Sequence, residues 1–173
     1  MFTTTLRGIG ASLILIAGMG TAMAQESTNV VATEGDWTVF AADNPRECWA
    51  VSPPKSTLNT KDGQPTEVTR GDIRLYVAYR PGQKGEVSFS GGYPFAPDST
   101  VEVDVGGRKF NLFTEGESAW TGSPSDDEAL VGALRAGSSA VVTGRSARGT
   151  TTKDTFSLSG ITAATNTAQE RCK

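Results

Sequence analysis

A strict two-residue alternation over residues 72–80 is the clearest indication of how this chain folds. Ile73, Leu75, Val77 and Tyr79 share one face of this segment, while arginine, tyrosine and alanine side chains share the other. Successive side chains of a β-strand point to opposite faces of a sheet, so a period of two residues is a strand signal. The segment therefore predicts a β-strand with one buried face.

Seven further segments resemble strands, and turn-forming residues separate them. The pair Gly106-Gly107 lies between two of these segments and is typical of a hairpin turn, because glycine readily adopts the positive φ angles that such turns require. Residues 55–69 are mostly polar and predict a mobile loop. About eight short strands with turns between them predict an all-β, antiparallel sandwich or barrel. The seven further strands are expected at 35–41, 47–52, 86–90, 101–105, 109–113, 140–145 and 151–158.

Two helices are expected within this β framework. Ser125 and Glu128 match a capping box, in which a serine begins a helix and a glutamate three residues later bonds back to it. The apolar stripe that follows ends before Gly137, and glycine commonly terminates helices. The prediction is one short internal helix between residues 125 and 137 and a short C-terminal helical tail over residues 161–170.

The first 24 residues have the three parts of a secretory signal peptide. Arg7 provides the positive charge, residues 9–17 form a short apolar run, and Ala22-Met23-Ala24 has the small-x-small form that signal peptidase reads. The apolar run is well short of the ~20 residues that a membrane-spanning helix needs. We therefore expect residues 1–24 to be removed on export, and residues 25–173 to form one β-sandwich domain without a transmembrane segment in a periplasmic or secreted protein.

Export gives the two cysteines a structural interpretation. Disulfides persist in oxidising compartments, and Cys48 and Cys172 are an even pair, so we expect them to be bonded. The bond would close a loop of about 125 residues, for which chain entropy gives an upper stabilisation of about 5 kcal/mol. The sequence has no Cys-x-x-Cys motif, which favours a structural bond over a redox pair.

The composition argues against several classes of function. The sequence contains no histidine, which is the commonest general base and a common metal ligand. The net charge of −3 argues against nucleic-acid binding, which usually requires a basic face. Asp126, Asp127 and Glu128 are consecutive, so on a helix they point in different directions and do not converge on a cation. We therefore expect no enzyme activity, no cofactor and no metal.

The remaining candidates for a binding surface are aromatic side chains and one charged tripeptide. Tyr93 and Phe95 flank Pro94 in a glycine-rich loop, where a stiff, exposed aromatic pair could anchor a partner. A loop folded over the end of the sandwich explains the same residues. Arg70-Gly71-Asp72 spells a tripeptide that some cell-surface receptors bind, although Asp72 also begins the clearest strand. The three tryptophans are expected in the core: Trp37, Trp49 and Trp120.

Six segments carry a family resemblance, in order, over essentially the whole mature chain: 35–37, 47–52, 70–73, 92–94, 154–158 and 160–164. Together they resemble the invasion associated locus B family of exported Gram-negative proteins. The resemblance implies an immunoglobulin-like antiparallel β-sandwich, periplasmic or outer-membrane-associated, in a family named for host-cell invasion. It implies no catalytic residues. Many relatives carry another cysteine close to the first tryptophan, where this chain has Val39-Phe40-Ala41, so no second disulfide is expected.

Two function hypotheses follow. In the first, the chain is a non-enzymatic binding or envelope-associated protein, involved in host-cell interaction, whose partner is an unknown protein or envelope component. In the second, it is a periplasmic hydrolase with an unrecognised carboxylate site, since two facing carboxylates can cleave glycosides. The absence of histidine and the presence of the aromatic loop favour the first hypothesis.

Overall fold

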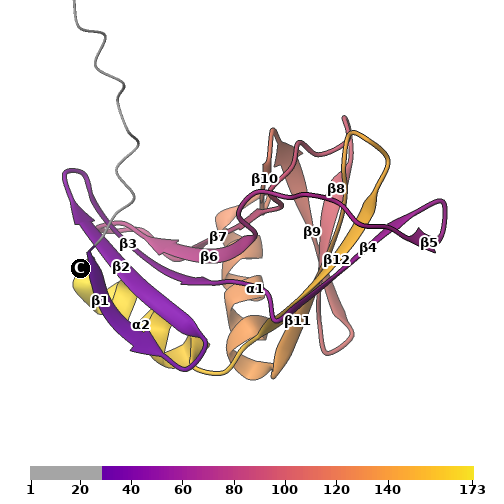
Figure 1. The fold of residues 1–173 in the computed structure, drawn as a ribbon. Coiled ribbons are helices and arrows are strands. Elements are labelled where there is room, and N and C mark those ends of the chain that lie inside the picture. Colours follow the sequence, from indigo (N-terminus) through magenta and orange to yellow (C-terminus); the bar gives the residue numbers. More distant parts are fainter. Residues whose placement is uncertain (1–28) are drawn as a thin grey trace, which may run out of the picture.

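The computed structural model describes residues 29–173, and the predicted signal peptide at residues 1–24 lies outside this part of the chain (Figure 1). Its helices are α1 (Pro124–Ala136) and α2 (Ile161–Arg171). Its strands are β1 (Val30–Glu34), β2 (Trp37–Asp43), β3 (Arg46–Ser52), β4 (Ser56–Lys61), β5 (Gln64–Pro65), β6 (Arg74–Tyr79), β7 (Glu86–Ser90), β8 (Thr100–Val105), β9 (Arg108–Glu115), β10 (Ser118–Trp120), β11 (Ser139–Arg145) and β12 (Thr151–Ser157).

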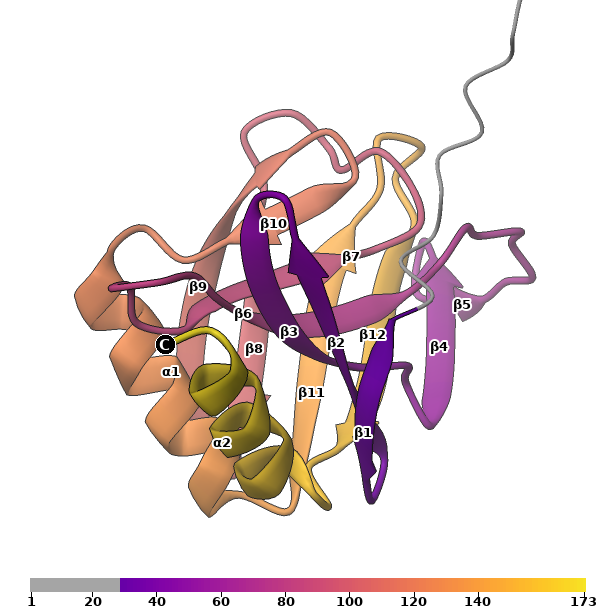
Figure 2. The same cartoon turned by 90° about the vertical axis from the view of Figure 1, so that its left-hand side faces the viewer.

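The strands of the described chain form one 12-stranded antiparallel sheet in the order β1-β2-β3-β6-β7-β10-β9-β8-β11-β12-β4-β5. Twist curls this sheet, so that β6 and β7 run across β8, β11 and β12 in Figure 2. Phe89 of β7 meets Phe156 of β12 edge to face, with ring centroids 6.2 Å apart. The two halves of one sheet therefore bury their inner faces against each other.

This architecture confirms a mostly β, antiparallel fold with one internal and one C-terminal helix. An immunoglobulin-like sandwich is not shown, because such a fold needs two separate sheets. Here backbone pairing runs through every neighbouring pair of strands from β1 to β5, and β10 bridges β7 and β9. Continuous curling buries the apolar faces without a break in the sheet.

All eight segments predicted as strands are strands, with bounds shifted by a few residues. The prediction of a mobile loop at residues 55–69 is wrong over its first part, which forms the β4–β5 hairpin. Asp62 and Gly63 make its turn with φ angles of 50° and 78°, the positive pair that suits the twist of a hairpin. Backbone pairing of β4 with β12 explains how a polar segment becomes a strand.

Helix α1 is confirmed, but Ser123 rather than Ser125 is its N-cap. Ser123 Oγ accepts a hydrogen bond from Asp126 N at 3.2 Å, and Pro124 takes the start of the helix, where its fixed φ fits and its missing N–H is not needed. Gly137 ends the helix as predicted, with an extended backbone. A Cβ at Gly137 would lie 2.5 Å from Val105 Cγ1, so lack of space requires glycine there.

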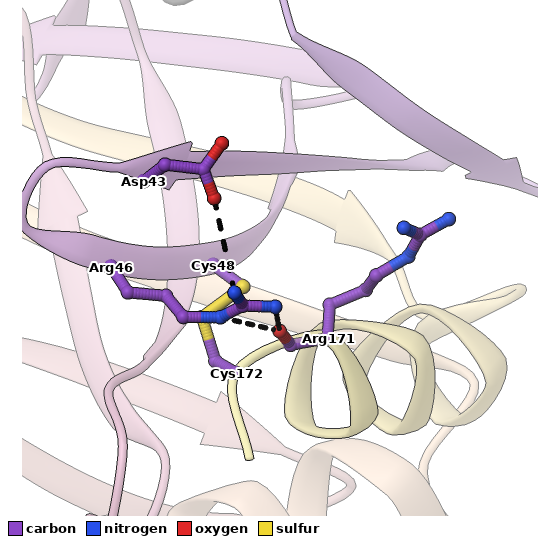
Figure 3. Close-up of a disulfide and its surroundings, with 5 residues drawn as sticks. All are labelled: Asp43, Arg46, Cys48, Arg171 and Cys172. Atoms are coloured by element: carbon purple, nitrogen blue, oxygen red, sulfur yellow. Dashed lines mark hydrogen bonds and ion pairs between the residues drawn. A yellow bond between two sulfur atoms is a disulfide. The ribbon is translucent and has the colours of Figure 1, made fainter.

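Helix α2 packs against β1, β2, β3 and β6, and the disulfide fixes its C-terminal end. Cys172 directly follows the helix and bonds to Cys48 on the inner face of β3, which confirms the predicted pair (Figure 3). The Arg46 guanidinium donates to the Arg171 carbonyl oxygen at 3.0 and 2.6 Å. A cation stabilises this end of a helix because the unpaired carbonyls carry partial negative charge.

The core fills the space between the halves of the curled sheet and the two helices. Trp37 is fully buried, and its Nε1 donates to the Ser157 carbonyl oxygen at 3.0 Å, which joins β2 to the end of β12. Within residues 29–173, neither helix is long and apolar enough to cross a membrane.

Candidate functional site

A groove of about 680 Å³ lies on the outer face of β2, β3, β6, β7 and β10. The opposite face of the same strands is core, so alternation along each strand decides which side chains reach the groove. The groove residues combine aromatic rings, two arginines and three carboxylates with small side chains. They are Phe40, Glu47, Trp49, Val51, Asp72, Arg74, Tyr76, Ala78, Arg80, Glu86, Ser88 and Trp120.

Strand pairing explains why this face is hollow. Eight groove residues stand in two neighbouring rows across the sheet, with Trp49 in one row and Trp120 in the other. The small side chains of Ala78 and Ser88 lie on β6 and β7, between the two tryptophans. The short side chains of Ala78 and Ser88 leave a depression beside the Tyr76 ring of β6. The rows are Phe40–Trp49–Ala78–Glu86 and Val51–Tyr76–Ser88–Trp120.

Neighbouring rings hold the groove tryptophans in place. Phe40 and Trp49 are stacked, with centroids 5.9 Å apart and planes 14° apart. Trp120 packs against Phe113 with centroids 5.8 Å apart. Offset aromatic pairs are attractive beyond the area that they bury, so each tryptophan presents an ordered surface.

The charged residues of the groove form ion pairs with one another. Arg80 contacts Glu47 at 2.5 Å and Glu86 at 3.4 Å, and Arg74 contacts Asp72 at 3.5 Å. All five side chains are partly or largely exposed. The groove therefore offers hydrogen-bond donors and acceptors together, without a block of one charge.

The prediction that all three tryptophans lie in the core is wrong for two of them. Trp37 is in the core, but Trp49 and Trp120 are half-buried on the outer face. The signal was present in the sequence: Cys48 must face inward to reach Cys172, so its neighbour Trp49 faces outward. Trp120 lies on the three-residue strand β10, which is too short to show alternation.

The predicted binding loop lies elsewhere and is mostly packed. Phe95 is 7% exposed and belongs to the core, and its ring meets that of Tyr93 edge-on with centroids 5.0 Å apart. The half-buried Tyr93 hydroxyl shares a 2.6 Å hydrogen bond with Thr152, and burial raises the pKa of Tyr93. Pro94 is exposed. A role for this loop in binding stays a prediction, and the accessible part of it is Pro94.

Arg70, the first residue of the receptor-like tripeptide, is buried in a structural network. Its guanidinium forms two 2.7 Å hydrogen bonds with the carboxylate of Asp154, and their side chains are 6% and 0% exposed. Its other donor contacts are to the Gly91 carbonyl oxygen and Asn59 Oδ1, and the guanidinium lies 5.0 Å from the centroid of the Tyr93 ring. A receptor could not bind this arginine without breaking that network.

Glycine makes this close packing possible. The backbone of Gly92 has a φ of +69°, and a Cβ there would lie 2.6 Å from the Gly71 carbonyl oxygen. The backbones of the two glycines are joined by a hydrogen bond from Gly71 N to Gly92 O at 2.8 Å. The second residue of the tripeptide is therefore also part of the internal framework.

The acidic residues of helix α1 have structural partners. Asp127 is buried and accepts hydrogen bonds from Val87 N at 2.7 Å and from the Thr121 hydroxyl at 2.6 Å, which fixes the helix to β7. In the described part of the chain, no three acidic or cysteine side chains come together as metal ligands.

Comparisons with known proteins give one family match and one structural likeness. The family model described as the invasion associated locus B (IalB) protein matches residues 37–169. The crystal structure of invasion associated protein b from Bartonella henselae is similar, with a TM-score of 0.55 and 15% identity over 79% of this chain and 94% of that chain. At this identity the structural likeness shows the fold alone. A search of curated proteins gave no match.

Proposed function

Since the chain belongs to the invasion associated locus B family, we propose that it is an exported, non-enzymatic binding protein whose ligand occupies the outer groove. The observation that carries this proposal is the pair of ordered tryptophans, Trp49 and Trp120, on the two sides of one depression. Aromatic surfaces beside a few polar groups are the usual composition of a ligand site.

The charged groups of the groove support binding rather than hydrolysis. Glycoside hydrolysis needs one carboxylic acid and one carboxylate that face the same bond. Glu47 and Glu86 instead share Arg80, and Asp72 pairs with Arg74. In this arrangement all three carboxylates are engaged by arginine side chains.

We place this activity outside the cytoplasm, in the periplasm or at the outer membrane. The predicted signal at residues 1–24 and the Cys48–Cys172 bond support that setting, because disulfides persist in oxidising compartments. The similar Bartonella protein is called an invasion associated protein. We therefore propose that the groove acts during contact with a host cell.

Capture experiments test this proposal. The purified protein and its Trp49→Ala variant are immobilised and exposed to bacterial envelope extract and to host-cell membrane extract. We expect saturable capture of a component by the wild type, weakened about tenfold or more in the variant. Leu58→Ala, which removes an exposed apolar side chain from β4, is the matched control and should capture normally. Absence of capture, or equal capture by Trp49→Ala, would contradict a binding role for the groove.

A further inference from the structure

The side chains of the groove restrict the chemical class of ligand that it can bind. Its tryptophans lie on β3 and β10, three strand spacings apart in the sheet order, which corresponds to about 14 Å. That span exceeds one small ring and suits an elongated ligand. The strands between the tryptophans carry the small side chains Ala78 and Ser88 together with the Tyr76 ring.

The ion pairs indicate a ligand without net charge. An anionic ligand is usually recognised by unpaired cations, and a cationic ligand by unpaired carboxylates. Here the three carboxylates outnumber the two arginines by one, but Arg80 is shared by Glu47 and Glu86 and Arg74 is paired with Asp72, so each of these five charges has an opposite charge beside it. A guanidinium and a carboxylate in a pair retain donors and acceptors directed to solvent, and these suit hydroxyl groups, which both donate and accept.

We propose that the groove binds a short neutral oligosaccharide, an inference that rests on the proposed binding function and specifies its ligand class. A sugar ring has one apolar face of C–H groups, which packs on an aromatic face, and a rim of hydroxyls. The Trp49 and Trp120 rings provide the apolar surfaces at the two ends of the ligand. Arg74, Arg80 and their partner carboxylates take the hydroxyls between them.

The experiment measures binding of defined sugars to the purified protein by calorimetry and by tryptophan fluorescence. The probes are linear neutral oligomers of glucose, galactose, mannose and N-acetylglucosamine, together with sulfated and sialylated oligosaccharides. We expect at least one neutral oligomer to bind, with affinity unaffected by added NaCl because no net charge is neutralised. Trp49→Ala and Trp120→Ala should each weaken binding about tenfold, and Leu58→Ala should leave it unchanged.

Three results would overturn the inference: no neutral oligomer binds, either tryptophan variant binds as tightly as the wild type, or only charged sugars bind and salt abolishes that binding. Protease and periodate treatment of the captured envelope or host component distinguishes failure of the oligosaccharide inference from failure of the proposed binding function. If capture depends on Trp49 but is destroyed by protease and survives periodate, the groove is a binding site for a protein and the oligosaccharide inference is wrong. If neither capture nor sugar binding occurs, both proposals fail.

Discussion

Two regions of this molecule combine arginine, carboxylate and aromatic side chains. In the buried cluster, the Arg70 guanidinium forms hydrogen bonds with Asp154, Asn59 and the Gly91 carbonyl oxygen, and it lies over the Tyr93 ring. In the groove, the Arg80 side chain is 39% exposed and divides its contacts between two glutamates. The first region is closed by neighbouring strands and loops, whereas the second opens to solvent.

Burial and donor count, rather than residue type, distinguish these regions. All five N–H groups of Arg70 have acceptors within the protein, so no donor remains for a ligand. Arg80 also forms close pairs, at 2.5 and 3.4 Å, but its side chain is 39% exposed and borders the open groove. The same three kinds of side chain therefore stabilise the fold in one place and are available for recognition in the other.

The largest expected difference in the free energy of unfolding is between the variants Arg70→Ala and Arg80→Ala. Loss of Arg70 leaves the Asp154 carboxylate buried without its cation, and should lower the free energy of unfolding by about 3–5 kcal/mol. Arg80→Ala removes two partly exposed ion pairs and should change the free energy of unfolding by at most about 1 kcal/mol. Urea denaturation of both variants measures the difference. Equal losses would contradict the distinction between cluster and groove.

A rescue variant tests whether the charge of Asp154 causes the loss. Combining Arg70→Met with Asp154→Leu replaces both ions by apolar side chains. Because no charge is then left buried, the double variant should recover much of the stability that Arg70→Ala loses. If the double variant is as unstable as Arg70→Ala, lost packing or the lost contact with Gly91 explains the effect instead.

Removal of the disulfide should lower the stability of the whole fold and also loosen the groove half locally, because the bond ties the end of α2 to β3. The double change Cys48→Ala and Cys172→Ala should lower the free energy of unfolding by about 2–5 kcal/mol, because the unfolded chain regains freedom. Hydrogen exchange should increase first in β2, β3 and α2, the elements that the bond joins or neighbours. Uniform change across the sheet would contradict this local effect.

Mass spectrometry of the unreduced wild type should show two hydrogens fewer than the reduced form.

Tyr93→Phe should have a small effect on stability and the clearest dependence on pH. It removes the hydrogen bond to Thr152 but keeps the ring beside Arg70, so we expect a loss of about 0.5–1.5 kcal/mol at neutral pH. Burial raises the pKa values of Tyr79 and Tyr93, so the folded state favours the neutral phenols. Their contribution is complete below the unfolded value of about 10 and is lost as pH rises through the folded values.

Alkaline denaturation tests the expected direction of this pH dependence. Wild type should lose stability above about pH 10, and Tyr93→Phe should lose less over the same interval because one of the two phenols is absent. Trp49→Phe, a groove variant that changes no titrating group, should follow the wild-type pH dependence. Parallel losses in wild type and Tyr93→Phe would show that Tyr93 does not contribute to alkaline unfolding.

Local pattern was sufficient to predict eight of the twelve strands of the described chain, both helices and the disulfide, but it missed β1, β4, β5 and β10. Alternation in β6 and the glycine turn at 106–107 depend on neighbouring residues alone, so both could be predicted from the sequence without knowledge of the tertiary structure. The cysteine pair was predictable because the chain has only two cysteines. The N-cap of α1 was missed because Ser123 and Ser125 both fit a capping motif, and Pro124 favours the earlier start.

The groove and the buried cluster depended on tertiary structure. Trp49 and Trp120 are far apart in sequence and share one face only because β3, β6, β7 and β10 are neighbours in the sheet. Arg70 and Asp154 meet because a loop before β6 passes over β12, and nothing near either residue in the sequence specifies the other. The sequence by itself determined the periodic elements, since their hydrogen bonds and side-chain alternation are local or repeat along the chain. Strand order, and with it the choice of which arginine is buried and which is accessible, was decided by how the curled sheet brings distant segments together.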